Sequence, residues 1–237
     1  MAQQLRDRSN PRLVPLLKTR RVADLIVDTL GELGVDTFYG IPGGAISPIY
    51  DALHGTDRLL INTRHETGAV FMAAGHSRVG GSLPCVLMTS GPGITNALTG
   101  LASAYADGIP LLAIGGEVAR NNFGRGALQE GTKYELDIIG MVRSVTKYSH
   151  AVVNPRAAAN VVRRAVATAR SGRRGPVFLS LPLDVACEQV LPSSMSSHVS
   201  TGFDVDTSML AQTAAVLDEP NVVSSSLAQG AATHPMS

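Results

Sequence analysis

The chain contains 237 residues, which is enough for one large domain or for one domain and the beginning of another. Hydrophobic residues make up 44% of it and charged residues only 16%, against about 25% in typical globular proteins. This composition supports a well-buried core. The net charge of +1, the 4% of aromatic residues and the lack of Trp argue against nucleic acid as a partner. No apolar run approaches the roughly 18–20 residues that span a bilayer, so we expect no membrane partner.

The two cysteines, Cys85 and Cys187, do not have the spacing of metal ligands, and we assign no metal-binding residue. Cys85 lies in the apolar run 84–88 and is interpreted as a small buried hydrophobic residue. Such cysteine usage is typical of a reducing compartment, which predicts a cytoplasmic protein.

Residues 1–17 are polar and basic, with Arg6, Arg8 and Arg12, and lack the hydrophobic segment of a signal peptide. We expect them to form a flexible leader. An organellar transit segment is the alternative interpretation that this composition leaves open.

From residue 18 to residue 190, helical and strand-like patterns alternate, which predicts one domain. The first helix places Val22, Ile26 and Leu30 on one side and ends at Gly34. In chain order the sequence then predicts a strand at 37–41, a helix at 46–54, a strand at 59–63, a helix at 66–77, a strand at 86–89, a helix at 94–105, a strand at 111–114, a helix at 154–171 and a strand at 177–181.

Residues 191–237 have a different character. The segment 192–203 is rich in Ser and predicts a linker, 207–217 predicts a helix, and 222–237 shows no periodicity. We expect 191–237 to be a linker and the incomplete start of a central domain, poorly ordered.

Continuous apolar strands that alternate with amphipathic helices predict an α/β fold with a parallel sheet and helices on both faces. Ligands of such sheets bind beyond the carboxyl ends of the strands. The turns after Ile41, Thr63, Thr89 and Ile114 are therefore the segments in which a site is expected.

The first of these turns is Gly40-Ile41-Pro42-Gly43-Gly44-Ala45. Its glycines would let the backbone approach a ligand, because no Cβ stands in the way. An ordinary strand-to-helix turn explains the same residues, so the motif alone is weak.

The second turn places Glu66 where a strand ends and a helix begins. The spacing Thr63-x-x-Glu66 fits a capping box, in which the carboxyl group bonds back to the start of the helix. The functional alternative is a carboxyl group that projects into a cleft, where burial would let it exchange a proton near neutral pH. Spacing alone favours the cap.

The third turn, residues 89–96, again follows a strand and opens a helix. Ser90 or Thr95 could cap that helix, and free N–H groups there could face a polar ligand. The turn lacks the glycine pattern of a dinucleotide fingerprint and the Gly-Lys-Ser/Thr of a phosphate loop, which argues against a nicotinamide-binding module.

Taken together, these motifs carry a resemblance. Gly-Ile-Pro-Gly-Gly-Ala-Ile (40–46), Arg-His-Glu-Thr-Gly-Ala (64–69) and Thr-Ser-Gly-Pro-Gly-Ile-Thr-Asn (89–96) have the order and spacing of the acetolactate-synthase family of thiamine-diphosphate enzymes. Further matches at 109–111, 129–130, 146–147 and 175–177 extend the resemblance over about residues 18–190. The chain therefore resembles the N-terminal, pyrimidine-binding domain of that family.

The resemblance implies a mechanism and a set of site residues. Glu66 would hydrogen-bond N1′ of the cofactor's aminopyrimidine and promote loss of the thiazolium C2 proton, after which a 2-oxo acid loses carbon dioxide and its acyl unit passes to an acceptor. It is thus interpreted as the catalytic residue, a role compatible with capping. The implied cofactor-binding residues are Pro42, Gly43, Gly44, Glu66, Pro92 and Asn96, and the implied substrate-proximal residue is Gln129.

Two positions depart from the family pattern. Leu128 stands where the family has Phe, which bears on the identity of the acceptor substrate. His76 replaces a family Tyr and is interpreted as a packing residue rather than a catalyst.

The family's Gly-Asp-Gly…Asn motif, which holds Mg²⁺ and the cofactor's diphosphate, does not occur in the chain. We therefore expect the chain to be incomplete alone and to share thiamine diphosphate with a partner domain that holds Mg²⁺. The expected partner is a diphosphate-binding domain on another chain, and self-association through the exposed pairing face is the alternative. Full-length members of the family can also bind FAD.

Two other functions stay open beside the acetolactate-synthase reaction. A 2-oxo-acid decarboxylase subunit would share the chemistry of Glu66 up to the loss of carbon dioxide. A truncated, non-catalytic remnant would only bind a related chain, and the irregular sequence of 222–237 favours this reading.

Overall fold

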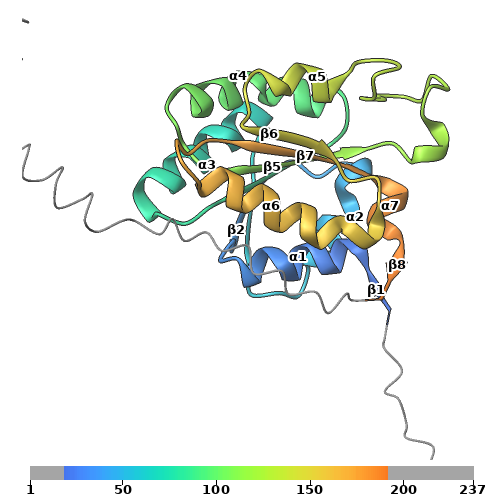
Figure 1. Ribbon diagram of the computed structural model, residues 1–237, viewed down its shortest axis with the longest axis horizontal. Helices are drawn as coiled ribbons and strands as arrows, with labels where there is room; N and C mark the ends of the chain where they lie inside the picture. The colour runs from blue at the N-terminus through green and yellow to red at the C-terminus, as the bar shows by residue number, and fades with distance from the viewer. Residues whose placement is uncertain (1–18, 192–237) are drawn as a thin grey trace, which may run out of the picture. The chain divides into compact units, whose positions relative to one another are not determined.

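The computed structural model describes residues 19–191, in which helices and strands alternate along most of the chain (Figure 1). Its elements are β1 (Arg20–Arg21), α1 (Val22–Glu32), β2 (Thr37–Gly40), η1 (Gly44–Ile46), α2 (Ser47–Leu53), β3 (Leu59–Asn62), α3 (Glu66–Gly80), β4 (Cys85–Met88), α4 (Pro92–Ala106), β5 (Leu112–Glu117), η2 (Arg120–Asn122), α5 (Ile138–Arg143), β6 (Tyr148–Ala151), η3 (Pro155–Ala157), α6 (Ala158–Arg170), β7 (Val177–Pro182), α7 (Leu183–Cys187) and β8 (Gln189–Val190).

Six strands form one sheet in the order β3-β2-β4-β5-β7-β6, and every neighbouring pair in it is parallel. The strands β2, β4, β5 and β7 are internal, and their side chains are almost all buried because helices cover both faces. The carboxyl ends of all six strands therefore lie at the same edge of the sheet, as the sequence predicts.

Alternate strand residues enter two separate cores. Phe38 of β2 packs on the face covered by α1, α2, α6 and α7, whereas Phe178 of β7 packs on the face covered by α3, α4 and α5 (Figure 1). The predicted α/β fold, a parallel sheet with helices on both faces, is confirmed.

The predicted helix boundaries agree with the structure to within a few residues. The helix α1 ends where expected, because Gly34 follows it with a left-handed backbone at φ +71°. The segment predicted as one helix at 154–171 begins as the short turn η3, capped by the Asn154 side chain, and continues as α6.

The elements that were not predicted include the edge strand β6 and the helix α5. The edge strand β6 has the sequence Tyr-Ser-His-Ala and is only half buried, so it lacks the apolar run of an internal strand. The helix α5 has six residues and lies at the end of a long connection from β5.

The short antiparallel pair β1–β8 joins the two ends of the described part, with Arg20 opposite Val190. Predictions for residues 1–17 and for the linker and helix beyond residue 191 lie outside the described residues. Within 19–191, no helix has the length and apolar character needed to cross a membrane.

Candidate functional site

Three neighbouring strands, β3, β2 and β4, deliver the three unusual turns to one edge of the sheet. The turn after β2 contains Pro42, Gly43 and Gly44; the turn after β3 leads to Glu66; and the turn after β4 opens α4. Strand order therefore brings together segments that are separated by about 20 residues each along the chain. This is the edge at which ligands of parallel sheets bind.

Glu66 is the first residue of α3 and its residue surface is only 8% exposed. Asn96 of α4 donates a hydrogen bond from Nδ2 to Oε2 of Glu66 over 3.0 Å. The hydroxyl group of Thr67 in turn donates to the backbone carbonyl of Asn96. These contacts tie the start of α3 to the first turns of α4 and fix the orientation of the carboxyl group.

The predicted capping box at Thr63 and Glu66 is wrong. The helix α3 begins two residues later than a box would require, and His65 is its N-cap, accepting a bond from the backbone N–H of Thr67 at Nδ1 over 3.2 Å. Thr63 instead donates to the carbonyl oxygens of His65 and Gly40. The carboxyl group of Glu66 thus bonds to a side chain of another helix rather than to its own helix start.

Two glycines of these turns, Gly43 and Gly93, pack closely against the side chain of Thr89. A β-carbon on Gly93 would lie 3.6 Å from Oε1 of Glu66 and 2.9 Å from Cγ2 of Thr89. A β-carbon on Gly43 would lie 2.5 Å from Cβ of Thr89. Thr89 therefore packs against both glycines and connects the turn after β2 with the start of α4.

The other cofactor-binding candidates of the first turn lie at the surface. Pro42 and Gly44 are exposed, and a β-carbon on Gly44 would meet no atom within 4 Å. The structure thus places them at the same edge as Glu66, with open space beside Gly44.

The start of α4 is built differently from what the sequence predicts. Gly91 is the N-cap, with a left-handed backbone at φ +57° and no side-chain cap, so the predicted caps by Ser90 and Thr95 are wrong. The backbone N–H groups of residues 93–95 bond to the carbonyl oxygens of Ser90 and Gly91 and are not free for a ligand. Pro92, the first residue of the helix, is exposed. The polar groups at this point come from Glu66 and Asn96.

Gln129 reaches the same region from the long connection between β5 and α5. Its side chain is exposed and its backbone is left-handed at φ +63°, which is uncommon for a residue other than glycine. A β-carbon on Gly91 would lie 2.9 Å from Cβ of Gln129. Gln129 therefore sits directly against the N-cap of α4, close to the residues that surround Glu66.

A second buried carboxyl group at this edge, Glu117, was missed. It is the last residue of β5, only 2% exposed, and accepts hydrogen bonds from the N–H groups of Val118 and Gly131. Burial raises the pKa of Glu117, the two backbone hydrogen bonds oppose this shift, and the charge of Glu130 adds to it. The strand-end rule could have found it, had the strand been predicted to extend beyond Ile114.

The three turns lie within one stretch of the chain that matches a known protein family. The model of the family described as "Thiamine pyrophosphate enzyme, N-terminal TPP binding domain" matches residues 20–141, which is more than half of the chain. The chain belongs to the thiamine pyrophosphate enzyme family. The matched range contains Glu66, Asn96 and Gln129, and it ends inside α5.

The relatives of this family member include acetolactate synthases. The chain is 40% identical over 178 residues to the acetolactate synthase large subunit of Lactococcus lactis, covering 75% of this chain and 30% of that protein. It is 45% identical over 166 residues to the isozyme 3 large subunit of Escherichia coli, covering 69% and 28%. It is 42% identical over 159 residues to the mitochondrial catalytic subunit of Saccharomyces cerevisiae, covering 67% and 22%. The chain thus spans less than a third of the length of these relatives.

His76, which stands where the family has Tyr, packs within this thiamine pyrophosphate enzyme domain. Its ring lies edge-on to Tyr39, whose hydroxyl group is 2.9 Å from Nδ1 of His76, and Nε2 lies 2.6 Å from the Ser82 hydroxyl group. Both ring nitrogens are therefore engaged within the domain, as expected of a packing residue.

The residues at the sheet edge fit the aminopyrimidine end of thiamine pyrophosphate. An aminopyrimidine is flat and carries ring nitrogens, so it needs a narrow space and a polar group that can share a proton. Gly93 places no β-carbon beside Oε1 of Glu66, and Oε2 is held by Asn96, so one carboxyl oxygen is left to meet such a ring.

Proposed function

We propose that this chain supplies the aminopyrimidine-binding part of a thiamine-diphosphate site in an enzyme that decarboxylates a 2-oxo acid and transfers the acyl unit to an acceptor, as an acetolactate synthase does. The observation that carries this proposal is the buried carboxyl group of Glu66, oriented by Asn96 at the carboxyl end of the sheet. The order of the three turns and the similarity to acetolactate synthase large subunits support it.

Thiamine diphosphate, when bound, supplies the carbon nucleophile and accepts the electrons released by decarboxylation. Glu66 has the simpler task of holding and moving one proton at Oε1, opposite a ring nitrogen of the aminopyrimidine. Asn96 occupies Oε2 and so leaves Oε1 as the oxygen that meets the ring. Gly93, which has no β-carbon, lets the ring approach Oε1, and Gln129, which lies against Gly91, faces the substrate.

The diphosphate and its Mg²⁺ belong, in this proposal, to a diphosphate-binding domain on another chain. Mg²⁺ is usually held by one or two carboxylates together with phosphate oxygens. In this proposal both oxygens of Glu66 are already engaged, Oε2 by Asn96 and Oε1 by the aminopyrimidine, so the Mg²⁺ ligands come from the other domain. No residue of the site is assigned to FAD. A cytoplasmic location completes the proposal, supported by the two free cysteines, Cys85 and Cys187.

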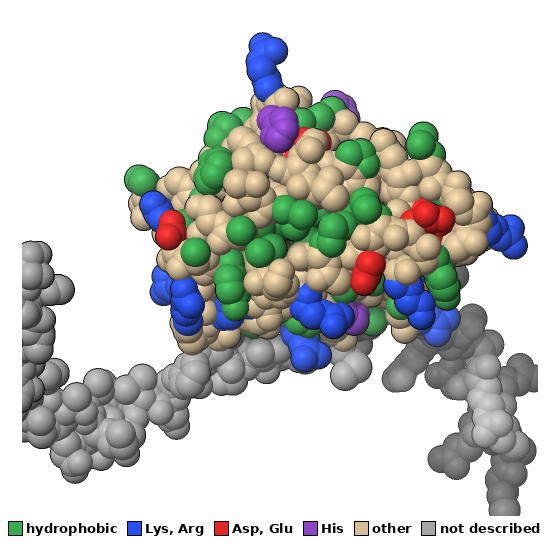
Figure 2. Space-filling view, turned by 90° about the horizontal axis from the view of Figure 1, so that it is seen from above, with side chains coloured by type: hydrophobic (Ala, Val, Ile, Leu, Met, Phe, Trp, Pro, Cys, Tyr) green, Lys and Arg blue, Asp and Glu red, His purple; other side chains and the backbone are tan. Residues whose placement is uncertain are grey.

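The outer face of α3 and α4 supports the need for a partner. Phe71, Met72 and Val79 of α3 are exposed, as are the small residues Ala102 and Ala106 of α4, the helix that packs against α3. Figure 2 looks onto the layer of helices that contains α3 and α4, and hydrophobic side chains and backbone fill its centre while charged side chains lie mainly along its rim. We call the exposed residues Phe71, Met72, Val79, Ala102 and Ala106 the α3–α4 face and assign it to the partner domain.

Calorimetry with thiamine diphosphate and Mg²⁺ tests this proposal. The full chain is titrated alone and together with a separate chain that carries the Gly-Asp-Gly…Asn domain of an acetolactate synthase large subunit. We expect tight binding of thiamine diphosphate only in the mixture. Glu66→Ala should weaken this binding, or lower the rate at which carbon dioxide is released from pyruvate, by about 10²-fold or more.

The matched control is Asp57→Ala, which truncates an exposed carboxyl group two residues before β3, at the opposite edge of the sheet. It should leave both measurements unchanged. Equal binding and turnover by the Glu66→Ala and parent chains would contradict the role of Glu66. Product analysis separates the two reactions, because a decarboxylase releases an aldehyde and an acetolactate synthase a longer hydroxy acid. A chain that binds the partner without any turnover would be the non-catalytic alternative.

A further inference from the structure

The connection between β5 and α5, residues 118–137, contains a buried carboxyl group within a largely exposed stretch. Glu130 is 3% exposed, whereas its neighbours Leu128 and Gln129 lie at the surface, and Leu128 is 86% exposed. Glu117, at the strand end where the connection begins, is buried as well. Buried carboxyl groups are rare unless their oxygens accept hydrogen bonds. The hydrogen-bond partners of Glu117 and Glu130 therefore show which parts of the connection the two side chains fix in place.

Glu117 bonds to the far end of the connection. Both of its carboxyl oxygens lie 3.1 Å from the backbone nitrogen of Gly131, and Oε1 also accepts from Val118 over 2.8 Å. A β-carbon on Gly131 would come within 2.6 Å of Oε2 of Glu117 and of Cγ1 of Ile138. Only glycine therefore allows the strand end to hold residue 131 so closely.

Glu130 bonds to the other side of the same bend. Its Oε1 accepts from the backbone N–H of Gly124 over 2.8 Å and from the hydroxyl group of Thr132. These bonds lower the pKa of Glu130, the Thr132 contact having the largest effect. Its Oε2 is buried without a hydrogen-bond partner among the described residues. The carboxyl group thus closes residues 124–132 into a compact bend with Leu128 and Gln129 at its tip.

The tip itself has a backbone that needs support. Gln129 is left-handed at φ +63° and touches Gly91, itself left-handed at φ +57°. A residue other than glycine keeps such a conformation only when its surroundings enforce it. Glu130 and Gly131, the next two residues, are the points at which the carboxyl groups act.

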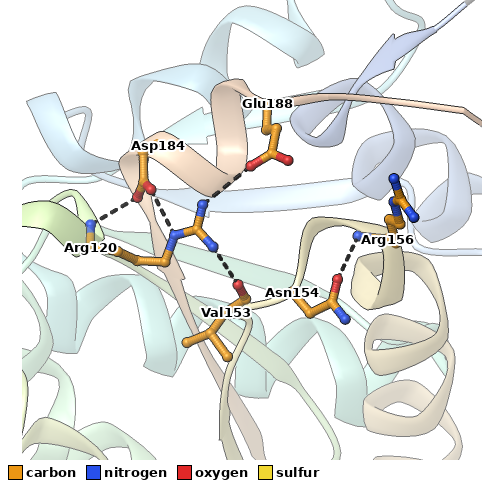
Figure 3. Close-up of polar contacts among 6 residues, drawn as sticks. All are labelled: Arg120, Val153, Asn154, Arg156, Asp184 and Glu188. Atoms are coloured by element: carbon orange, nitrogen blue, oxygen red, sulfur yellow. Dashed lines mark hydrogen bonds and ion pairs between the residues drawn. The ribbon is translucent and has the colours of Figure 1, made fainter.

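The start of the connection is fixed separately (Figure 3). Arg120 donates to Asp184 from its backbone nitrogen and from Nε, over 2.9 and 2.7 Å, and its terminal nitrogens reach the Val153 carbonyl oxygen and Glu188. The figure shows the guanidinium group between α7 and the turn that follows β6. This anchor leaves the bend that carries Gln129 to be placed by Glu117 and Glu130.

We propose that Glu117 and Glu130 are positioning residues that hold the Leu128–Gln129 tip against the N-cap of α4. They act through the backbone of the bend, and neither is placed in contact with cofactor or substrate. The consequence for the reaction rests on the proposed function of Gln129, whereas the consequence for the position of the tip does not.

The position of the tip is measured on the full chain with a nitroxide label at residue 128. The label is attached to Leu128→Cys in a Cys187→Ser background, since Cys85 is buried. In the parent the label should strongly broaden the amide signals of Gly93 and Ile94. Glu130→Ala or Glu117→Ala should restore most of the lost intensity. Glu117→Gln should keep the broadening, because one carbonyl oxygen at the Oε1 position still accepts from both Val118 and Gly131.

Glu135→Ala is the matched control, because this glutamate is exposed in the same connection and its side chain makes no hydrogen bond or ion pair within residues 19–191. It should leave the broadening unchanged. Circular dichroism checks that each variant folds. If Glu130→Ala does not fold, Glu130→Gln replaces it, and the expected loss of broadening is then smaller but has the same sign. Unchanged broadening in both alanine variants would overturn the proposal.

Turnover in the mixture with the partner chain tests the effect on the reaction. Glu130→Ala should lower kcat/KM for pyruvate by about 10²-fold or more, because displacing a substrate-facing group by only about 1 Å already has an effect of that size, while thiamine-diphosphate affinity stays at the parent value. Lost cofactor affinity or unchanged kcat/KM would contradict the positioning role. If the parent mixture shows no turnover, the proposed function fails, and the label experiment alone still decides whether the two carboxyl groups position the tip.

Discussion

Gly43 and Gly44 are adjacent in the sequence, but the structure requires glycine at only one of them. A β-carbon on Gly43 would lie 2.5 Å from Cβ of Thr89, closer than real β-carbons approach, whereas one on Gly44 would meet nothing within 4 Å. The backbone of Gly43 is extended at φ −163°, so the requirement comes from packing and not from conformation.

Alanine at these two positions should therefore have different effects on stability. Gly43→Ala should lower the free energy of unfolding by about 1–3 kcal/mol, because the turn after β2 must move away from Thr89. Gly44→Ala should change it by less than about 0.5 kcal/mol. Urea unfolding followed by circular dichroism measures both. Equal effects of the two substitutions would show that the turn after β2 can move away from Thr89 without loss of stability.

Glu117 gives the stability a dependence on pH. Burial raises its pKa above the ordinary 4.5, with the charge of Glu130 adding to the shift against the backbone hydrogen bonds. The folded chain then binds this proton more tightly than the unfolded chain, so the stabilising contribution is complete below about pH 4.5 and is lost as pH rises through the folded pKa.

Glu117→Gln removes that proton equilibrium and keeps the hydrogen bonds made at Oε1. The free energy of unfolding of the variant, relative to that of the parent, should rise between about pH 4.5 and about pH 8. Urea titrations at both pH values measure it, with Glu135→Gln as a control that should follow the parent. Parallel profiles of Glu117→Gln and parent would contradict the assignment.

At the scale of elements, one side chain joins three of them at the carboxyl edge. Arg120, just after β5, binds Asp184 and Glu188 at the two ends of α7 and the Val153 carbonyl oxygen after β6 (Figure 3). Burial alone would raise the pKa of Asp184, but the hydrogen bonds and charge of Arg120 lower it. The carboxylate form is therefore the one that stabilises the junction.

Arg120→Ala should lower the free energy of unfolding by about 1–2 kcal/mol, a value reduced by the partial exposure of the pair. Because the pKa of Asp184 is lowered, the coupling between the two residues is present above about pH 4 and is lost as pH falls below it. A double-mutant cycle with Asp184→Asn, measured at about pH 7 and about pH 3, checks this. A coupling that is the same at both pH values would contradict it.

Which elements the sequence predicts follows from how they are buried. The internal strands are apolar runs because both of their faces are covered, and these were predicted. The strand β5 was predicted to end at Ile114 because Gly115, Gly116 and Glu117 have no apolar side chain. They are buried because Ile94 and the Ala45 backbone occupy the space that β-carbons would need on the two glycines. Such close approaches leave no periodic signal.

The candidate site was predictable to the extent that its residues follow strands. Glu66, Asn96 and the glycine turns were found by the strand-end rule and the resemblance. The N-cap His65, the Thr89 contact and the tie between Thr67 and Asn96 depend on atoms of different elements, so local patterns could not reveal them. Glu130 was visible only as part of a motif, and its burial follows from the bend around it.

At the scale of the whole described domain, the α3–α4 face should promote association. Met72 of this face is 47% exposed, and the small side chains of Ala102 and Ala106 in the same face allow close approach of another surface. Met72→Lys should shift the chain alone toward monomer in sedimentation velocity at all concentrations. Val153→Lys, an exposed apolar residue after β6, should not. A parent that stays monomeric would show that this face needs a different domain as its partner.

Different residues hold the bend against Gly91 and present its tip to an incoming substrate. The bend is fixed by carboxyl groups beneath it, so the outward-facing Leu128 contributes little to its shape. A change at residue 128 can therefore alter what an incoming acceptor meets while the architecture under it stays intact. Substrate preference could in this way drift during evolution, or be redesigned, through a single surface position without loss of folding.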